Sequence, residues 1–156
     1  MAAEAGMYNV EGLDKLMRSF DRLPINLQKK GLTAAVRKGA NVIRDAARAN
    51  AVAIDDPTTA EMIQKNIAVQ NSARRGKAVG GVVMRVGVMG GARPRPETEG
   101  KGAPGGATWH WRFIELGSET TQQRPLLRDA ARKSGQAAID VLAQELTKQI
   151  AKLELA

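Results

Sequence analysis

His110 is the residue best suited to acid–base chemistry at neutral pH, and it is the single histidine of the chain. Together with a serine and a carboxylate it could form a nucleophilic triad. No serine occupies a Gly-x-Ser-x-Gly turn, however, and His110 is flanked by Trp109 and Trp111. Such a histidine is better interpreted as a packing or rim residue. We therefore expect no catalytic residue and no enzymatic activity.

The residues that could bind a metal or a cofactor are few. Asp55 and Asp56 could bind a cation, but adjacent carboxylates before a proline more often form a turn and cap a helix. Glu115 stands among apolar residues and is expected to form an ion pair with Arg112 or Arg128. The chain has no cysteine, which excludes disulfides and thiolate zinc sites, and no phosphate-loop motif. We expect neither a metal nor a cofactor.

The charge of the chain points to a polyanion or an acidic surface as a partner. The net charge is +8 and the pI is about 10.2. Residues 12–50 carry nine Lys and Arg against three acidic residues, and this stretch could follow a phosphate backbone. No recognition-helix or zinc-finger motif accompanies it. Trp109 and Trp111 could stack on single-stranded bases, but in a chain with 3% aromatic residues they fit better as core or interface anchors.

These residues must be positioned mainly by helices. Apolar residues at helical spacing predict a short helix from Gly12, which Pro24 ends. A long basic helix is expected from Ile25 to Ala51, weakened by two glycines unless another backbone packs closely there. A last helix should open at Arg124-Pro125 and continue close to the C-terminus, with proline in its first turn.

A small sheet is expected between the long helices. Thr58 or Thr59 could cap one helical turn carrying Glu61 and Met62. Strands are predicted around Ile67 to Gln70 and from Val79 to Val88, joined by a solvated connection over Asn71 to Lys77. A third strand is expected where Trp109, Trp111 and Phe113 alternate. The order indicates one α+β domain over residues 1–156, with helices packed on a small antiparallel sheet.

The segment Gly90–Thr108 differs from the rest in composition. It contains six glycines and three prolines with almost no large apolar side chain. Such a segment buries too little surface to offset its ordering entropy, so we expect a mobile loop at about 90–108. Arg93 and Arg95 within it are candidates for pairing with acidic residues of a neighbouring subunit.

Three stretches resemble a known family. The first is Gly12 to Leu16 with Leu23-Pro24 and the basic helix, and the second runs from Asp55 to Val69. The third is Trp109-x-Trp-Arg-Phe-Ile-Glu-Leu-Gly117, followed by Arg124-Pro-Leu-Leu-Arg128. In this order and spacing they resemble the gene-product-ten-like family of phage neck and minor tail proteins.

The resemblance implies a structural virion protein of a long-tailed phage, without catalytic residues or cofactor. It implies a tail-completion or neck subunit, which forms a hexameric ring at the head–tail joint. The ring would connect the head-closure assembly to the tail terminator or tube and lie close to packaged DNA. Assembly in the host cytoplasm is expected, without a membrane. The candidate interface residues are Arg93, Arg95, Trp109, Trp111, Phe113, Glu115, Gly117, Arg124 and Pro125.

Two other roles remain open at this point. The first is a small basic nucleic-acid-binding protein that uses the helix Ile25–Ala51. The second is an assembly factor that is absent from the finished particle.

Overall fold

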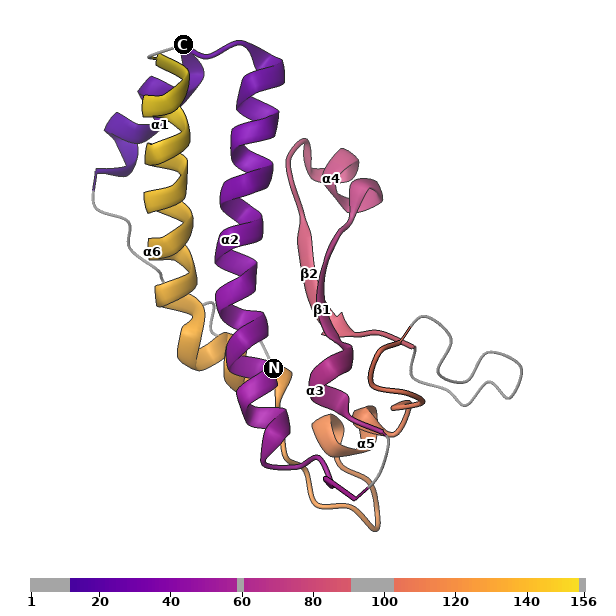
Figure 1. Ribbon diagram of the computed structural model, residues 1–156. Coiled ribbons are helices and arrows are strands. Elements are labelled where there is room, and N and C mark those ends of the chain that lie inside the picture. The colour runs from indigo at the N-terminus through magenta and orange to yellow at the C-terminus, as the bar shows by residue number, and fades with distance from the viewer. Residues whose placement is uncertain (1–11, 59–60, 91–102, 155–156) are drawn as a thin grey trace.

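Two long helices, α2 (Ile25–Val52) and α6 (Leu127–Glu154), lie side by side and run in opposite directions (Figure 1). The computed structural model describes residues 12–58, 61–90 and 103–154 of the chain. The short helix α1 (Leu13–Asp21) precedes α2, and Pro24 separates the two at the N-cap of α2. The predicted short first helix and long basic second helix are therefore confirmed, as is the long last helix. The predicted start of the last helix is wrong, however, because α6 begins at Leu127 and Pro125 precedes it instead of lying in its first turn.

The two long helices approach closely because small residues line their contact. Gly39 of α2 is buried, and a Cβ atom added to it would lie 2.7 Å from the carbonyl oxygen of Ala138 in α6. This is the close backbone approach that offsets the low helix propensity of a glycine. Among the helices in the described part of the chain, none is long and apolar enough to cross a membrane.

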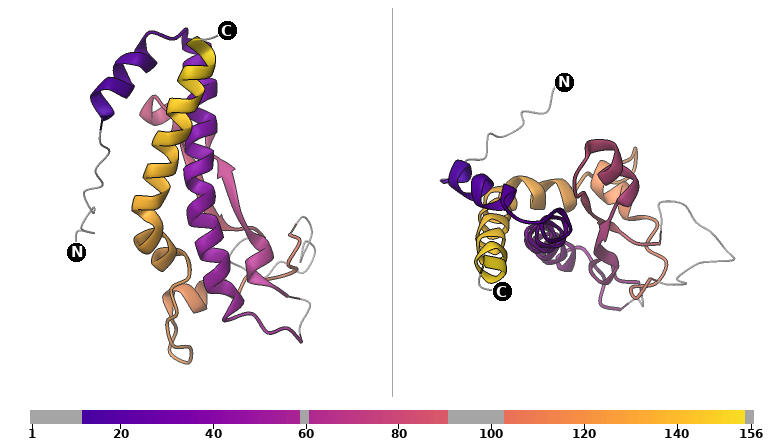
Figure 2. Two further views of the ribbon diagram at one scale, coloured as in Figure 1. Left: turned by 60° about the vertical axis from the view of Figure 1, so that its left-hand side comes forward. Right: turned by 90° about the horizontal axis from the view of Figure 1, so that it is seen from above.

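A two-stranded antiparallel sheet packs along the face of α2 that is turned away from α6 (Figure 2). Strand β1 (Ile67–Asn71) pairs with β2 (Met84–Val88), and Ile67 lies opposite Val88. The expected solvated connection is instead largely helical, because α4 (Ala73–Val79) occupies it. Gly80 ends α4 in the left-handed conformation, at a φ of 68°, that glycine adopts without strain. Val79 is thus a helix residue rather than the start of the second strand.

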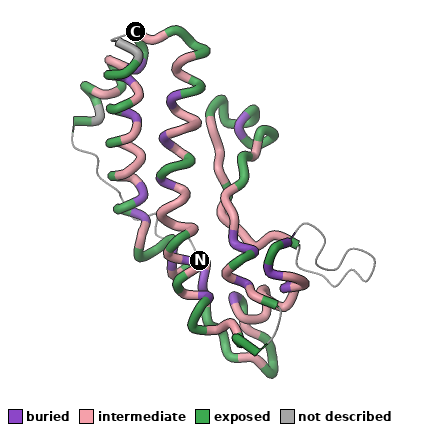
Figure 3. Tube along the Cα trace, in the orientation of Figure 1, coloured by how far each residue is buried: buried purple, intermediate pink, exposed green. Residues whose placement is uncertain are grey.

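The core is divided into two clusters along the α2–α6 pair. Figure 3 shows buried residues at intervals along both long helices. One cluster lies where α1 meets the long helices and includes Phe20, Ala35, Leu146 and Ile150. The other lies at the opposite end, where the sheet joins the helices. Its members are Ala47, Ala51, Ile63, Ile67, Leu126 and Ala130. Small and aliphatic residues dominate both clusters.

The predicted third strand is wrong, because Trp111–Leu116 forms the helix α5. Within the described residues the sheet has two strands. Trp109 and Phe113 stand four residues apart, a spacing that puts side chains on one face of a helix as well as on one face of a strand. Their rings meet edge to face with centroids 5.9 Å apart. Over so few residues the apolar pattern could not distinguish the two periodicities.

Candidate functional site

The candidate site is the segment 109–117, which contains α5, together with the start of α6. Its central contact is the Glu115 carboxylate, which is buried and accepts hydrogen bonds from three successive backbone amides. Its Oε2 atom lies 2.7 Å from the nitrogen of Leu126 and 2.9 Å from that of Leu127, and Oε1 lies 3.1 Å from the nitrogen of Arg128. Glu115 therefore caps α6 from a distant position in the sequence. Its negative charge also favours the positive end of the helix dipole.

Arg128 completes this contact from the first turn of α6. Its Nε atom donates to Glu115 Oε1 at 3.2 Å, and its Nη2 donates to the Glu115 carbonyl oxygen at 2.6 Å. Of the two predicted ion-pair partners, Arg128 is therefore confirmed. Arg112 instead places its guanidinium carbon 4.6 Å from the centre of the Phe113 ring. The buried Nε atom of Arg112 has no hydrogen-bond partner among the described residues.

The turn between α5 and α6 is fixed at both ends. Gly117 has a φ of 79° and a ψ of 168°, a conformation that is strained for any residue with a Cβ atom. The amide of Arg124 donates to the carbonyl of Ile114 at 2.7 Å, which brings the chain back to α5. Pro125 is half-buried directly before the fully buried Leu126. Gly117, Arg124 and Pro125 thus position α6 on α5.

The aromatic side chains of the segment have different roles. Trp111 packs against the core cluster that contains Ile63 and Leu126. Trp109 contacts Phe113 and His110 edge to face, and His110 Nδ1 lies 3.9 Å from a Glu61 carboxylate oxygen. The structure brings these residues together around one half-exposed aromatic cluster. It offers packing and surface contacts, as expected for a rim histidine.

Residues 103–108, the end of the expected mobile loop, are held by Asn66. This side chain is fully buried. Its Nδ2 atom donates to the Gly106 carbonyl at 2.9 Å and to Thr108 Oγ1 at 2.7 Å, and its Oδ1 accepts from the Gly105 amide at 2.7 Å. Asn66 ends α3 (Ile63–Asn66), so it fixes the loop end to the core. Arg93 and Arg95 lie outside the described residues.

Sequence reasoning missed the role of Asn66. It stands immediately before a strand and among apolar residues, where a polar side chain needs buried partners. That was the available signal. The partners themselves are about 40 residues away, so no local pattern indicates them.

Asp55 and Asp56 serve local structure. The Asp55 carboxylate accepts the amides of Ile63 at 2.8 Å and Gln64 at 3.0 Å, so Asp55 caps α3. Asp56 accepts the Thr58 hydroxyl at 2.7 Å, and hydrogen bonds from Thr58 lower the pKa of the Asp56 carboxyl. Glu61 and Met62 precede α3 rather than lying in it. Within the described residues, no three His, Cys, Asp or Glu side chains are grouped to hold a metal.

Two arginines of the basic helix α2 form contacts within the chain. Arg48 donates twice to the Ile67 carbonyl, from Nε at 3.1 Å and from Nη2 at 2.8 Å, and so fastens β1 to α2. Arg44 pairs with its neighbour Asp45 at 2.8 Å. Lys29, Lys30, Arg37 and Lys38, by contrast, are exposed. Within α2, the exposed basic residues therefore lie in its first half.

Comparison with known proteins identifies the family. A family model described as "Bacteriophage HK97-gp10, putative tail-component" matches residues 14–117, two thirds of the chain. The match runs from α1 to the end of the segment 109–117. No curated protein and no solved structure matches the chain. The resemblance found in the sequence is thereby confirmed, and the chain belongs to the HK97-gp10-like family of phage tail components.

Proposed function

We propose that this tail protein is a tail-completion (neck) subunit, which forms a ring, most simply a hexamer, between the head-closure assembly and the tail terminator or tube. Family membership supports a structural role in the virion, in contact with other tail or head proteins. The neck position is the finer inference. The observation that carries it is the construction of the segment 109–117, which is rigid at its base and apolar at its surface.

A surface that is already ordered before assembly lowers the entropy cost of a subunit contact. The Glu115 cap and the Arg128 contacts fix α5 on α6. Leu116, next to this cap, nevertheless leaves 64% of its surface exposed. An isolated exposed leucine is unremarkable, but Leu116 follows Phe113 by three residues on α5, and the Phe113 ring contacts that of Trp109. We propose that this surface contacts another subunit.

Residues 91–102, within the Gly/Pro-rich segment, are proposed to form a second contact between subunits. Arg93 and Arg95 within it would pair with acidic residues of the next subunit or ring. Gly/Pro-rich segments of this kind can order on binding, and a ring interface would offset the entropy of that ordering. Equal amide exchange rates of this segment in the free protein and in the assembled particle would contradict this part of the proposal.

The neck position can be tested by cryo-electron microscopy of the purified virion, with the head–tail joint reconstructed separately. We expect the α2–α6 pair to be recognisable in a ring between the portal side and the tail tube. Density for this fold elsewhere in the tail, or in no part of the virion, would reject the neck position. The second result would favour an assembly factor.

The alternative, a small basic nucleic-acid-binding protein, retains one supporting observation. Lys29, Lys30, Arg37 and Lys38 are exposed on the first half of α2. A salt-sensitive mobility shift of duplex DNA at sub-micromolar protein would favour this alternative, since phosphate contacts weaken steeply with salt.

A further inference from the structure

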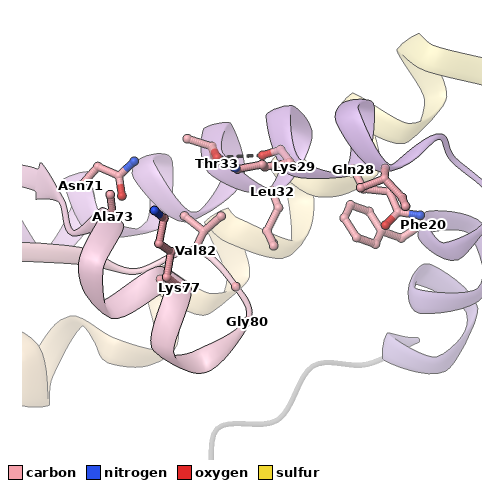
Figure 4. Close-up of a pocket in the computed structure, with 13 residues that line it drawn as sticks. Phe20, Gln28, Lys29, Leu32, Thr33, Asn71, Ala73, Lys77, Gly80 and Val82 are labelled. Carbon is pink, nitrogen blue, oxygen red and sulfur yellow. Dashed lines mark hydrogen bonds between the residues drawn. The ribbon is translucent and has the colours of Figure 1, made fainter.

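A groove of about 520 Å³ lies between α4 and the first half of α2 (Figure 4). Its apolar lining comes from three elements, with Phe20 at the end of α1, Leu32 on α2 and Val82 before β2. Lys29 and Lys77 line it from opposite sides. Ile25, which also lines the groove, leaves 83% of its surface exposed. An apolar floor between two lysines suits a peptide segment with apolar and acidic side chains.

The charged residues on the two walls of this groove are all basic. Residues 22–44 contain six Lys and Arg, residues 67–90 contain four, and neither stretch contains an Asp or Glu. These stretches include the first half of α2 and the whole β1–α4–β2 hairpin, which form the two walls. A groove with walls of one sign attracts the opposite charge strongly. Its occupant should therefore be acidic.

We propose that the groove binds residues 1–11 of a neighbouring copy of this chain. This segment carries Glu4 and Glu11 and no Lys or Arg. Met7, Tyr8 and Val10 supply apolar side chains that match the groove floor. The segment is thus complementary to the groove in both charge and hydrophobicity. Duplex DNA would match the lysines alone, because its phosphates gain nothing from an apolar floor.

The neighbouring copy is favoured over the same chain by the position of α1. In Figure 1 and in the right view of Figure 2, α1 lies on the far side of the α2–α6 pair from the β1–α4–β2 hairpin, and of α1 only its end, at Phe20, lines the groove. Residues 1–11 precede α1 and, fully extended, span at most about 40 Å. The segment of an adjacent copy would reach this groove without crossing its own helix pair. The inference rests on the proposed function only in that copies of the chain meet in a ring.

The test uses the natural absence of cysteine from residues 1–156. Val10→Cys is placed in one preparation and Ala73→Cys in another, since Ala73 lines the groove and is exposed. After mixing and mild oxidation, we expect a disulfide-linked dimer of the two variants on a non-reducing gel. As a matched control, Ala137→Cys replaces Ala73→Cys, because Ala137 is exposed on α6 away from the groove.

A dimer with Ala73→Cys but not with Ala137→Cys supports the proposal. Equal linkage to both positions, or none to either, overturns it. The double variant Val10→Cys/Ala73→Cys is tested at low concentration. If it forms only an intramolecular disulfide there and the mixed variants form none, the segment binds its own chain and the proposal is also overturned.

Charge exchange provides a second readout on the same cross-link. Glu4→Lys/Glu11→Lys and Lys29→Glu/Lys77→Glu should each lower the yield about fivefold, and their combination should restore it. Lys133→Glu/Lys148→Glu, on exposed positions of α6, makes an equal charge change and should leave the yield unaltered. Failure of the combination to restore the yield overturns the proposal. If Lys29→Glu/Lys77→Glu leaves the cross-link unchanged but abolishes binding of duplex DNA, the groove is a DNA-binding site and the proposal is overturned. The neck position is judged separately, by whether heads and tails join.

Discussion

The Glu115 carboxylate lies 2.7 Å from the backbone nitrogen of Leu126, a residue eleven positions further along the chain. This contact joins α5, where the family match ends, to α6, which lies beyond it. Through it, the surface that carries Trp109 and Leu116 is fixed to one of the two long helices. The hydrogen bonds of Glu115 therefore hold the proposed contact surface in a fixed position on the helical scaffold.

Glu115→Ala should lower the free energy of unfolding by about 2 kcal/mol, because three amides at the start of a helix lose their acceptor. Urea denaturation followed by circular dichroism measures this change. Glu119→Ala is the matched control, since Glu119 is exposed in the turn that follows. We expect the control to shift stability by less than about 0.5 kcal/mol. Equal effects of the two substitutions would show that Glu115 does not act as the cap.

Gly39→Ala and Gly31→Ala should change stability in opposite directions, although both glycines lie in α2. At Gly39 the new methyl group would meet the Ala138 carbonyl oxygen at 2.7 Å, so α2 and α6 must separate. At Gly31 the nearest atom is Gln149 Cβ at 3.6 Å, an ordinary contact. We expect Gly39→Ala to destabilise by about 1–3 kcal/mol. Gly31→Ala should stabilise by up to about 1 kcal/mol. Thermal unfolding of both variants checks this, and stabilisation by both would refute the close helix contact.

Asn66→Ala should destabilise the protein by about 2–3 kcal/mol and release residues 103–108. The buried Gly105 amide would lose its acceptor, and the Gly106 carbonyl would lose one of its two donors. Hydrogen exchange should show faster exchange of the Gly105 amide in this variant. Gln70→Ala, at an exposed position on β1, should leave that amide protected. If the Gly105 amide stays protected in Asn66→Ala, then Asn66 does not hold the loop end.

The sequence was sufficient for elements whose pattern extends over many residues. The helices around α2 and α6 and the strands at Ile67 and Val86 followed from long or β-branched apolar patterns. Over the five residues from Trp109 to Phe113, strand and helix patterns coincide, so the local signal could not decide between them. α4 was missed for a different reason. It is short and basic, and it has almost no apolar face.

The candidate site was predicted in part. An ion pair of Glu115 with Arg112 or Arg128 could be anticipated, because an apolar segment had to satisfy the carboxylate, but the sequence did not decide between the two arginines. The three backbone amides that Glu115 accepts could not be anticipated, since they depend on how α5 is placed against α6. The same holds for Asp55, whose capped amides lie eight and nine residues away. Long-range hydrogen bonds of this kind follow from the tertiary arrangement.

Leu116→Asp should leave the fold intact but prevent incorporation of the protein into particles. Leu116 is 64% exposed, so the substitution costs little stability in the free chain, whereas a buried charge in a subunit contact is strongly unfavourable. Val52→Asp is the control, because Val52 is 56% exposed at the end of α2, outside the segment 109–117. Complementation of a phage that lacks the gene measures both. Normal titre from Leu116→Asp would remove this surface from the proposed interface.

Trp111→Ala should also block assembly. It should do so both by destabilising the fold and by altering the proposed subunit contact. Trp111 packs against the core cluster, so its loss creates a cavity and lowers the free energy of unfolding by about 3 kcal/mol. Unfolding of the purified variant, measured beside its phage titre, separates the two effects. A normal titre would contradict the role of Trp111 as an anchor.

The most direct test of the neck assignment is electron microscopy of lysates from a phage that lacks this gene. We expect filled heads and separate, full-length tails that fail to join, with joining restored when the wild-type chain is supplied. Normally joined virions in the mutant lysate would contradict the neck role. Heads without any tails would place the protein earlier, in tail assembly itself.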